Sequence, residues 1–241
     1  MNQNVRRPAD RTMVTSPRIP VRAKVVPVWS FDDPRFALPP EPPFPPGTSP
    51  FHTLGVAYTG LLEFVTRKIP GGVPAFIKAM PTPSLARFFE QPFSSSRNYD
   101  VVPLPYAGAT IARMRGISFA DQLRDSNRIA ARAGFAKAYS TLLRTIRSDT
   151  LVLALPRAVA ILHDFGKVKV EVASPHCVEG ARAGLPHVLV AWSAISNGAF
   201  ISTMMEDGGA KDVRVTFSEP EPDGMVRGHP THRLPFRIEW R

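Results

Sequence analysis

The sequence has little cysteine and no long uninterrupted apolar run. A single cysteine, Cys177, excludes a disulfide within the chain and a zinc site built from several cysteines. Because no apolar run approaches the roughly 18 residues that a membrane span needs, we predict a soluble, cytoplasmic protein. The sequence also lacks a phosphate-binding loop and the local pattern of a Ser/His/Asp triad. A non-catalytic protein is therefore favoured over an enzyme.

Positive charge and proline are abundant instead. The net charge is +10, and most of the excess lies in residues 51–163. A basic surface of this kind is able to meet nucleic acid, an acidic protein or anionic lipid. A solvated arginine-rich surface is the favoured interpretation, and nucleic acid is not favoured as a partner, because few aromatic residues are interleaved with the arginines.

Residues 1–50 are predicted to be a basic, proline-rich tail. Seven prolines fall between positions 39 and 50, a composition typical of extended polyproline II structure. The P-x-x-P spacings allow docking into an SH3-like groove, whereas a semi-rigid spacer or a strap lying on the domain surface is the simpler interpretation. We predict a single domain for residues 51–241, with a helical half at 51–166 and a sheet module at 167–241.

The helical half shows apolar residues at three- and four-residue spacing. This pattern predicts helices at 53–68, 73–80, 84–91, 103–114 and 119–147, and a helix pair at 148–163 that is split at Pro156. In the longest helix, Arg124, Arg128 and Arg132 recur every fourth residue, with Asp121 and Asp125 placed to pair with the first two. The ladder is a candidate contact surface for an anion or partner, and a salt-bridged solvated face is the alternative.

The sheet module predicts the fold class. Alternation of apolar and polar residues predicts strands at 168–172, 176–182, 213–217 and 234–240. A helix opened by the Gly184–Pro186 break, with its apolar stripe running from Val188 to Met204, lies between the second and third strands, and the stretch 218–233 is expected to be an outward loop. Pro235 favours an edge position for the last strand, or a backbone that faces away from its neighbour there. The prediction is an α+β fold with a four-stranded antiparallel sheet in strand-strand-helix-strand-strand order.

Several short motifs resemble a paralogous family of uncharacterised myxobacterial proteins. The resemblance covers about residues 51–240 and implies no activity. The motifs are Tyr99-Asp100, Tyr106 to Arg113, Arg115-Gly116, Leu123 to Arg128, Tyr139, Leu142-Leu143, Leu155-Pro156-Arg157 and Ile238-Glu239-Trp240.

The order of elements also resembles the fold shared by 4-vinyl reductase domains, haem-NO-binding sensors and Bet3-type trafficking subunits. Such a resemblance implies an apolar ligand, haem or acyl chain between helices and sheet, or an interaction platform. The late cysteines of the 4-vinyl reductase pattern are missing, and His229 and His232 stand in the equivalent hairpin. The Tyr-x-Ser-x-Arg haem-propionate motif is absent as well, so haem is not favoured and the cofactor stays unknown.

We choose pocket candidates by size and polar tips, since a ligand pocket needs large apolar walls with few polar groups. For each of them a place in the filled core is the alternative. They are Tyr58, Phe88, Tyr139, His163, Trp192 and Phe200.

Other side chains offer weaker chemistry. His163-Asp164 resembles a base with its orienting carboxylate, but adjacent helical residues do not face each other. His176-Cys177 points to opposite faces of a strand, which favours a structural cysteine. His229-x-x-His232 lacks a clear third metal ligand, so no metal site is predicted.

The favoured hypothesis is a non-catalytic sensor or adaptor that binds an apolar small molecule. The alternative is a structural component, or homo-oligomer, that contacts an assembly through the basic helical face and the proline-rich strap. An open cavity behind Trp192 favours the first hypothesis, and a filled core with an exposed apolar patch favours the second.

Overall fold

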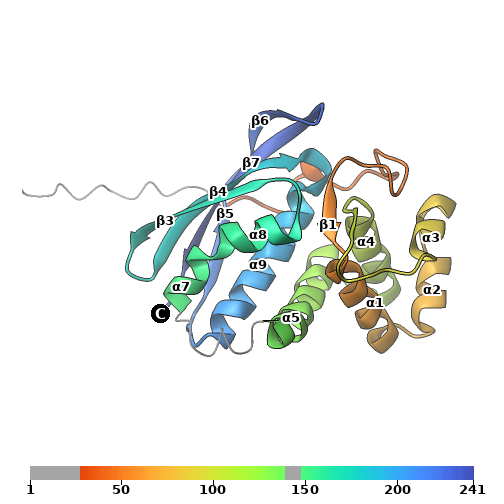
Figure 1. Cartoon of the computed structure of the whole chain (residues 1–241), viewed down its shortest axis with the longest axis horizontal. Helices are drawn as coiled ribbons and strands as arrows, with labels where there is room; N and C mark the ends of the chain where they lie inside the picture. The colour runs from red at the N-terminus through yellow and green to blue at the C-terminus, as the bar shows by residue number, and fades with distance from the viewer. Residues whose placement is uncertain (1–27, 139–147) are drawn as a thin grey trace, which may run out of the picture.

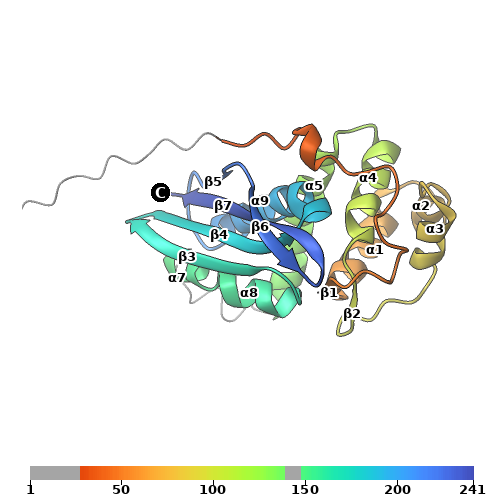
Figure 2. The same cartoon turned by 90° about the horizontal axis from the view of Figure 1, so that it is seen from above.

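The computed structural model describes residues 28–138 and 148–241, with side chains described outside 133–149. Helices α1 to α5 gather at one end of the molecule, and a twisted sheet with α7, α8 and α9 against one face forms the other end (Figures 1 and 2). The predicted α+β class is confirmed.

The main sheet is antiparallel and has five strands, one more than predicted. Its strands, in order across the sheet, are β3 (Lys167–Ser174), β4 (Cys177–Pro186), β7 (His229–Glu239) and β5 (Arg214–Phe217), with β6 (Glu221–Val226) also paired to β7. The expectation of a loop over 218–233 is therefore wrong. Turn formers at Gly228 and Pro230 mask the start of β7 in the sequence, because they interrupt the alternation that marks a strand.

Pro235 shows how a proline is accommodated in a central strand. Strand β7 pairs with β4 on one side and with β5 and β6 on the other, so the predicted edge position is wrong. The alternative expectation holds instead: the carbonyl oxygen of Pro235 accepts a hydrogen bond from Ser218 N at 3.0 Å, just past the end of β5 at Phe217. The N and O atoms of one residue point to the same side of an antiparallel strand. The missing N–H thus removes no hydrogen bond between β7 and β4.

Five α-helices precede residue 139 in the described part of the chain. They are α1 (Val56–Lys68), α2 (Gly72–Lys78), α3 (Pro83–Phe89), α4 (Pro103–Arg115) and α5 (Phe119–Ala138). Each corresponds to a predicted helix, and the predicted extension of α5 to residue 147 lies outside the described residues. The Ser118 hydroxyl caps α5 by accepting from Asp121 N at 3.0 Å, as the sequence indicated.

Two short strands were not predicted from the sequence. Strand β1 (His52–Leu54) pairs antiparallel with β2 (Asn98–Asp100), and the start of the predicted first helix belongs to β1. Three residues are too few to show alternation. The predicted helix pair is present as α7 (Ser148–Leu153) and α8 (Leu155–Leu162).

Helix α9 (Val190–Asp207) is the central helix of the sheet module. The stretch His187–Asp207 is long and apolar enough to cross a membrane by length and composition, with a mean hydropathy of 1.4, which the sequence reading overlooked. However, 67% of the 18-residue window that meets this test is buried inside the fold. Helix α9 packs against α5, β5 and β7, as a core helix does.

Residues 28–50, called the strap below, cross the surface from the sheet to the helical half (Figure 2). Trp29 donates its backbone N–H to Phe217 O at 2.8 Å, and both Trp29 and Phe36 are buried. At the other end, the carboxylate of Asp100 accepts from Gly47 N at 2.8 Å. The strap is therefore fastened to both parts of the fold.

Candidate functional site

The predicted pocket residues fall into two separate groups. Tyr58 and Phe88 are neighbours in the helical half, with ring centroids 5.7 Å apart. His163, at the end of α8, meets Trp192 of α9 edge to face at 6.5 Å. The half-buried Phe200 lies farther along α9. Tyr139 lies outside the described residues.

The group around Tyr58 is a closed aromatic core. Tyr58 is fully buried and stacks on Phe93, with ring centroids 4.5 Å apart and planes within 5°. Its hydroxyl donates to the carbonyl oxygen of Asp100, so its polar atom is satisfied. Burial, helped by the negative charge of Asp100, raises the pKa of Tyr58 well above its usual value. This group has the properties of core packing.

The arginine ladder on α5 is largely salt-bridged. The ion pairs of this face are Arg124–Asp121 (2.9 Å), Arg115–Asp125 (3.0 Å) and Arg132–Asp207 (3.8 Å). The expected pairing of Asp125 with Arg128 is wrong, because Arg115 of α4 lies close enough to take that carboxylate. Arg128 is exposed. Exposed pairs of this kind contribute at most about 1 kcal/mol each.

The most unusual group in the molecule is Arg182, in β4. Its side chain is 2% exposed and faces α9, where Nη1 donates to the Ser193 hydroxyl at 2.8 Å. The guanidinium lies over the ring of Phe165 at 5.2 Å. Within the described part of the chain, Nε and Nη2 have no hydrogen-bond partner. Burial lowers the pKa of Arg182 to about 10, so it remains a cation at neutral pH.

His163 approaches the same place from the end of α8. Its ring packs against Phe165 at 5.2 Å and Trp192 at 6.5 Å, and its Nδ1 is buried with no partner among the described residues. Burial and the charge of Arg182 hold the pKa of His163 well below its usual value. His163 is therefore neutral at pH 7, beside a cation.

Ser193 completes this group. Its oxygen accepts from Arg182 and also from Asn197 Nδ2 at 3.0 Å. With both lone pairs used, the hydroxyl hydrogen is directed away from these two donors and stays able to donate. We call His163, Phe165, Arg182, Trp192 and Ser193 the Arg182 site.

Asp164 lies next to this site but faces outward. Its carboxylate accepts from His52 N at 2.8 Å and from Arg227 Nη1 at 3.0 Å, and His52 Nδ1 lies 2.9 Å away. Burial alone would raise the pKa of Asp164, but the hydrogen bonds from His52 and Arg227 and the Arg227 charge hold it below its usual value. Asp164 links β1 to the β6–β7 hairpin and does not orient His163, so the base-and-orienter arrangement has no geometric support.

Arg227 is expected to stabilise this link. It also donates to the carbonyl oxygen of Pro50, so replacing Arg227 by alanine removes contacts to two segments. We expect the free energy of unfolding to fall by about 1 kcal/mol, since the groups are about a third exposed. Arg233→Ala, which breaks an exposed pair with Glu221 in the same hairpin, is the control and is expected to change it by less than about 0.5 kcal/mol. Urea unfolding measures the free energy of unfolding of the two variants. Equal decreases in both would contradict a stabilising role of the Arg227 contacts.

The late histidines do not converge. His229 and His232 lie in β7 and not in a loop, and residues three apart on a strand point to opposite faces. His229 packs on Phe44 at 4.8 Å, whereas His232 meets His187 at 5.0 Å. In the described residues no three His, Cys, Asp or Glu side chains are grouped as metal ligands.

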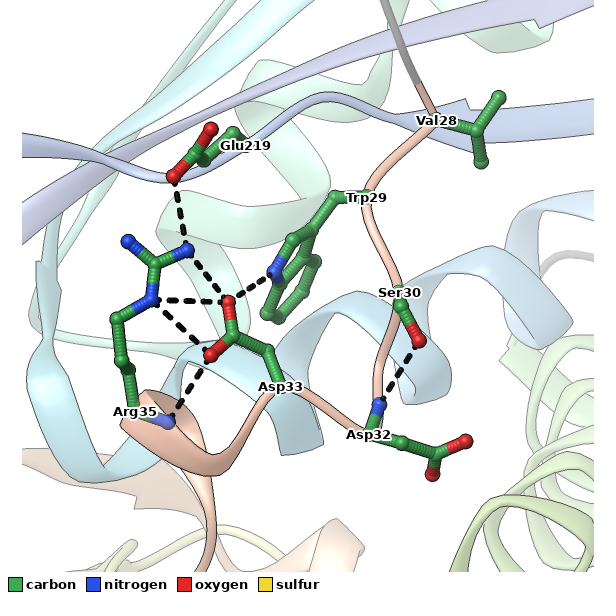
Figure 3. Close-up of a pocket in the computed structure, with 7 residues that line it drawn as sticks. All are labelled: Val28, Trp29, Ser30, Asp32, Asp33, Arg35 and Glu219. Atoms are coloured by element: carbon green, nitrogen blue, oxygen red, sulfur yellow. Dashed lines mark hydrogen bonds and ion pairs between the residues drawn. The ribbon is translucent and has the colours of Figure 1, made fainter.

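A surface cavity of about 340 Å³ lies against the strap (Figure 3). Its lining has three carboxylates (Asp32, Asp33 and Glu219) and one cation, Arg35, which pairs with Asp33 at 2.6 Å and with Glu219 at 2.8 Å. The indole of Trp29 donates to Asp33 at 3.1 Å. The cavity contains none of the predicted pocket residues, and its Arg35–Glu219 pair fastens the strap to the sheet module.

The sequence reading missed Arg182 and Ser193. A signal was present, because Arg182 has the same strand parity as Val178 and Gly180, which places a charged residue at a position that should face the helix. The register confirms the placement, since Val168 of β3 is its cross-strand partner.

No family model and no curated protein matches this sequence. Among solved structures, an oxygen-binding H-NOX domain related to soluble guanylate cyclases is similar with a TM-score of 0.56 at 10% identity, covering 78% of this chain and 95% of that one. The chain has the fold of an H-NOX domain. A T. tengcongensis H-NOX mutant gives a TM-score of 0.56 at 10% identity (78% and 97% covered), and the Fe(II) unliganded H-NOX protein from K. algicida gives 0.53 at 12% (78% and 96%). The predicted resemblance to haem-NO-binding sensors is confirmed as one of fold.

Another similar solved structure concerns haem distortion in the H-NOX family, which raises the question whether the residues of this chain fit a haem. A haem needs a flat cavity with an axial ligand facing it. Here the buried side chains between helices and sheet form one continuous core that includes Phe51, Phe165 and Leu189. The one cavity described above lies on the strap and is lined by no histidine. The residues of this H-NOX fold do not fit haem.

Proposed function

We propose that this chain is a non-catalytic sensor domain that binds a small, largely apolar molecule at the Arg182 site. The observation that carries the proposal is that Arg182 Nε and Nη2 and His163 Nδ1 are buried without a hydrogen-bond partner among the described residues, and that both side chains pack on the Phe165 ring. Buried polar atoms without partners are rare in folded proteins, and they concentrate where a ligand completes the structure.

The surroundings of the site support a ligand of this kind. Phe165 and Trp192 supply aromatic walls, and His163 and Ser193 supply polar tips, a combination typical of small-molecule pockets. The H-NOX fold of solved neighbours supports a sensing role by analogy. A cytoplasmic location, and the resemblance to the myxobacterial family, belong to the same proposal.

A second candidate is an adaptor that binds a protein partner or a second copy of the chain. Helix α8 favours it, because none of its residues is buried although most are aliphatic. Leu153 and Ile161 are about half exposed on α7 and α8. An apolar helix surface of this type is common at protein interfaces.

Native mass spectrometry of protein purified gently from its own host separates the two functions. A bound ligand is expected to add mass to the 26.5 kDa chain, and the excess should disappear on denaturation. Absorbance recorded in parallel detects a pigment. A clean chain mass within a defined oligomer or a complex with a partner protein would contradict the sensor and favour the adaptor.

A further inference from the structure

We propose that the Nε and Nη2 edge of Arg182 binds the carboxylate of an apolar organic acid. The inference rests on the proposed sensing function and names the chemical class of its ligand. It starts from charge: Arg182 is 2% exposed, and the described ion pairs include no carboxylate bound to it. A buried cation without a counter-ion costs several kcal/mol, and a bound anion removes that cost.

The geometry selects a carboxylate. With Nη1 donating to Ser193, the free donors are Nε–H and Nη2–H. These two N–H bonds run parallel along one edge of the guanidinium and match the two oxygens of a carboxylate. The Arg182 site therefore offers a bidentate fork.

Gly166 lies close against this edge. A Cβ atom at position 166 would lie 2.8 Å from Arg182 Nε and 3.4 Å from Nη2. Any side chain there would thus occupy the space in front of the fork. The two unpartnered nitrogens are buried against the backbone of the turn between α8 and β3, so a carboxylate reaches them only when this turn moves.

The neighbouring charges favour a monoanion. His163 packs on the same Phe165 ring as Arg182, and it is neutral at pH 7. Asp164 faces away, into its contacts with His52 and Arg227. A single cation balances one negative charge, whereas a phosphate dianion would leave an excess buried charge.

The walls favour an apolar remainder. Phe165 covers the guanidinium, Trp192 stands beside His163, and the aliphatic residues of α8 lie above β3 without being buried. An alkyl or aromatic tail that leaves the fork along α8 would bury this apolar surface. Affinity should then rise with chain length, since each buried methylene contributes about 0.8 kcal/mol, or nearly fourfold in affinity.

The test is a series of sodium acetate, butanoate, hexanoate and octanoate, with chloride at the same ionic strength. We expect the melting temperature to rise by about 3–6 °C at an octanoate concentration ten times its Kd, and Kd to fall with each added methylene. Native mass spectrometry should find one octanoate per chain. The variant Arg182→Met should lose both effects, and the exposed Arg128→Met, its matched control, should keep them.

Arg182→Lys retains a cation without the fork and is expected to bind octanoate about 10- to 100-fold more weakly. It also serves as the test if Arg182→Met fails to fold. Equal octanoate binding in Arg182→Met, or in Arg182→Lys, would overturn the proposal, and so would chloride that stabilises as well as octanoate does. A host-derived ligand without an acid group would overturn this inference while leaving the sensor function standing.

Discussion

Replacing Asp100 by alanine is expected to lower the free energy of unfolding by about 3–4 kcal/mol, because buried donors that lose a charged acceptor cost about 1–3 kcal/mol each. The Asp100 side chain is buried, and its carboxylate accepts from Gly47 N at 2.8 Å, Ser49 N at 3.2 Å, the Ser49 hydroxyl and Val102 N at 2.9 Å. The carboxylate thus fastens the strap to the start of α4. Urea unfolding measures the loss, and amide hydrogen exchange at Gly47 and Ser49 should accelerate with it.

Asp32→Ala is the matched control, since it removes an exposed carboxylate from the same strap. We expect its effect to stay within about 0.5 kcal/mol. If Asp100→Ala loses less than about 1 kcal/mol, water or a neighbouring oxygen must replace the carboxylate, and the strap is not held as described.

Acid should destabilise the protein through His163. Burial, with the charge of Arg182, lowers the pKa of His163 in the folded state well below the value of 6.5 expected when unfolded. As the pH falls through 6.5, the imidazole of His163 becomes protonated in the unfolded chain but stays neutral in the folded chain. The free energy of unfolding therefore falls. The slope approaches about 1.4 kcal/mol per pH unit, or roughly 2 kcal/mol between pH 6.5 and 5.

The variant His163→Leu should lose this part of the pH dependence, because it removes the titrating group. His176→Asn changes an exposed histidine in the β3–β4 turn and is expected to leave the profile unchanged. Unfolding free energies measured from pH 7.5 to 5 give the comparison. Parallel profiles for wild type and His163→Leu would show that His163 accepts a proton inside the fold.

The sequence predicts the elements of this fold where periodicity is long. Helices of a dozen residues and the alternating run from Leu234 to Trp240 stand out, because several repeats of a period support each of them. Strands β1 and β6 do not, since one is too short and the other contains Pro222 and Gly224. These strands form because each pairs with another strand in the folded protein. The apolar and polar pattern of the local sequence carries no information about that pairing.

The Arg182 site was harder to predict than the fold. Candidates chosen for bulk included His163 and Trp192, which do lie there, and Tyr58, whose hydroxyl is already bonded in the aromatic core. Arg182 was passed over because a charged residue in a strand is normally read as solvent-facing. Only the contact of Arg182 with Ser193 of α9 shows that its guanidinium is buried, with no carboxylate partner among the described residues.

The strap has a consequence for synthesis. Arg35 and its partner Glu219 are 184 residues apart, and Trp29 likewise docks on β5. At ribosomal rates of about 5–20 residues per second, the strap waits roughly 10–40 s for those partners to emerge. Throughout that time the apolar side chains of Trp29 and Phe36 remain exposed, because the residues that cover them have not been synthesised. Docking of the strap is therefore a late step of folding in the cell. Until then, chaperones are able to bind these two exposed side chains on the nascent chain.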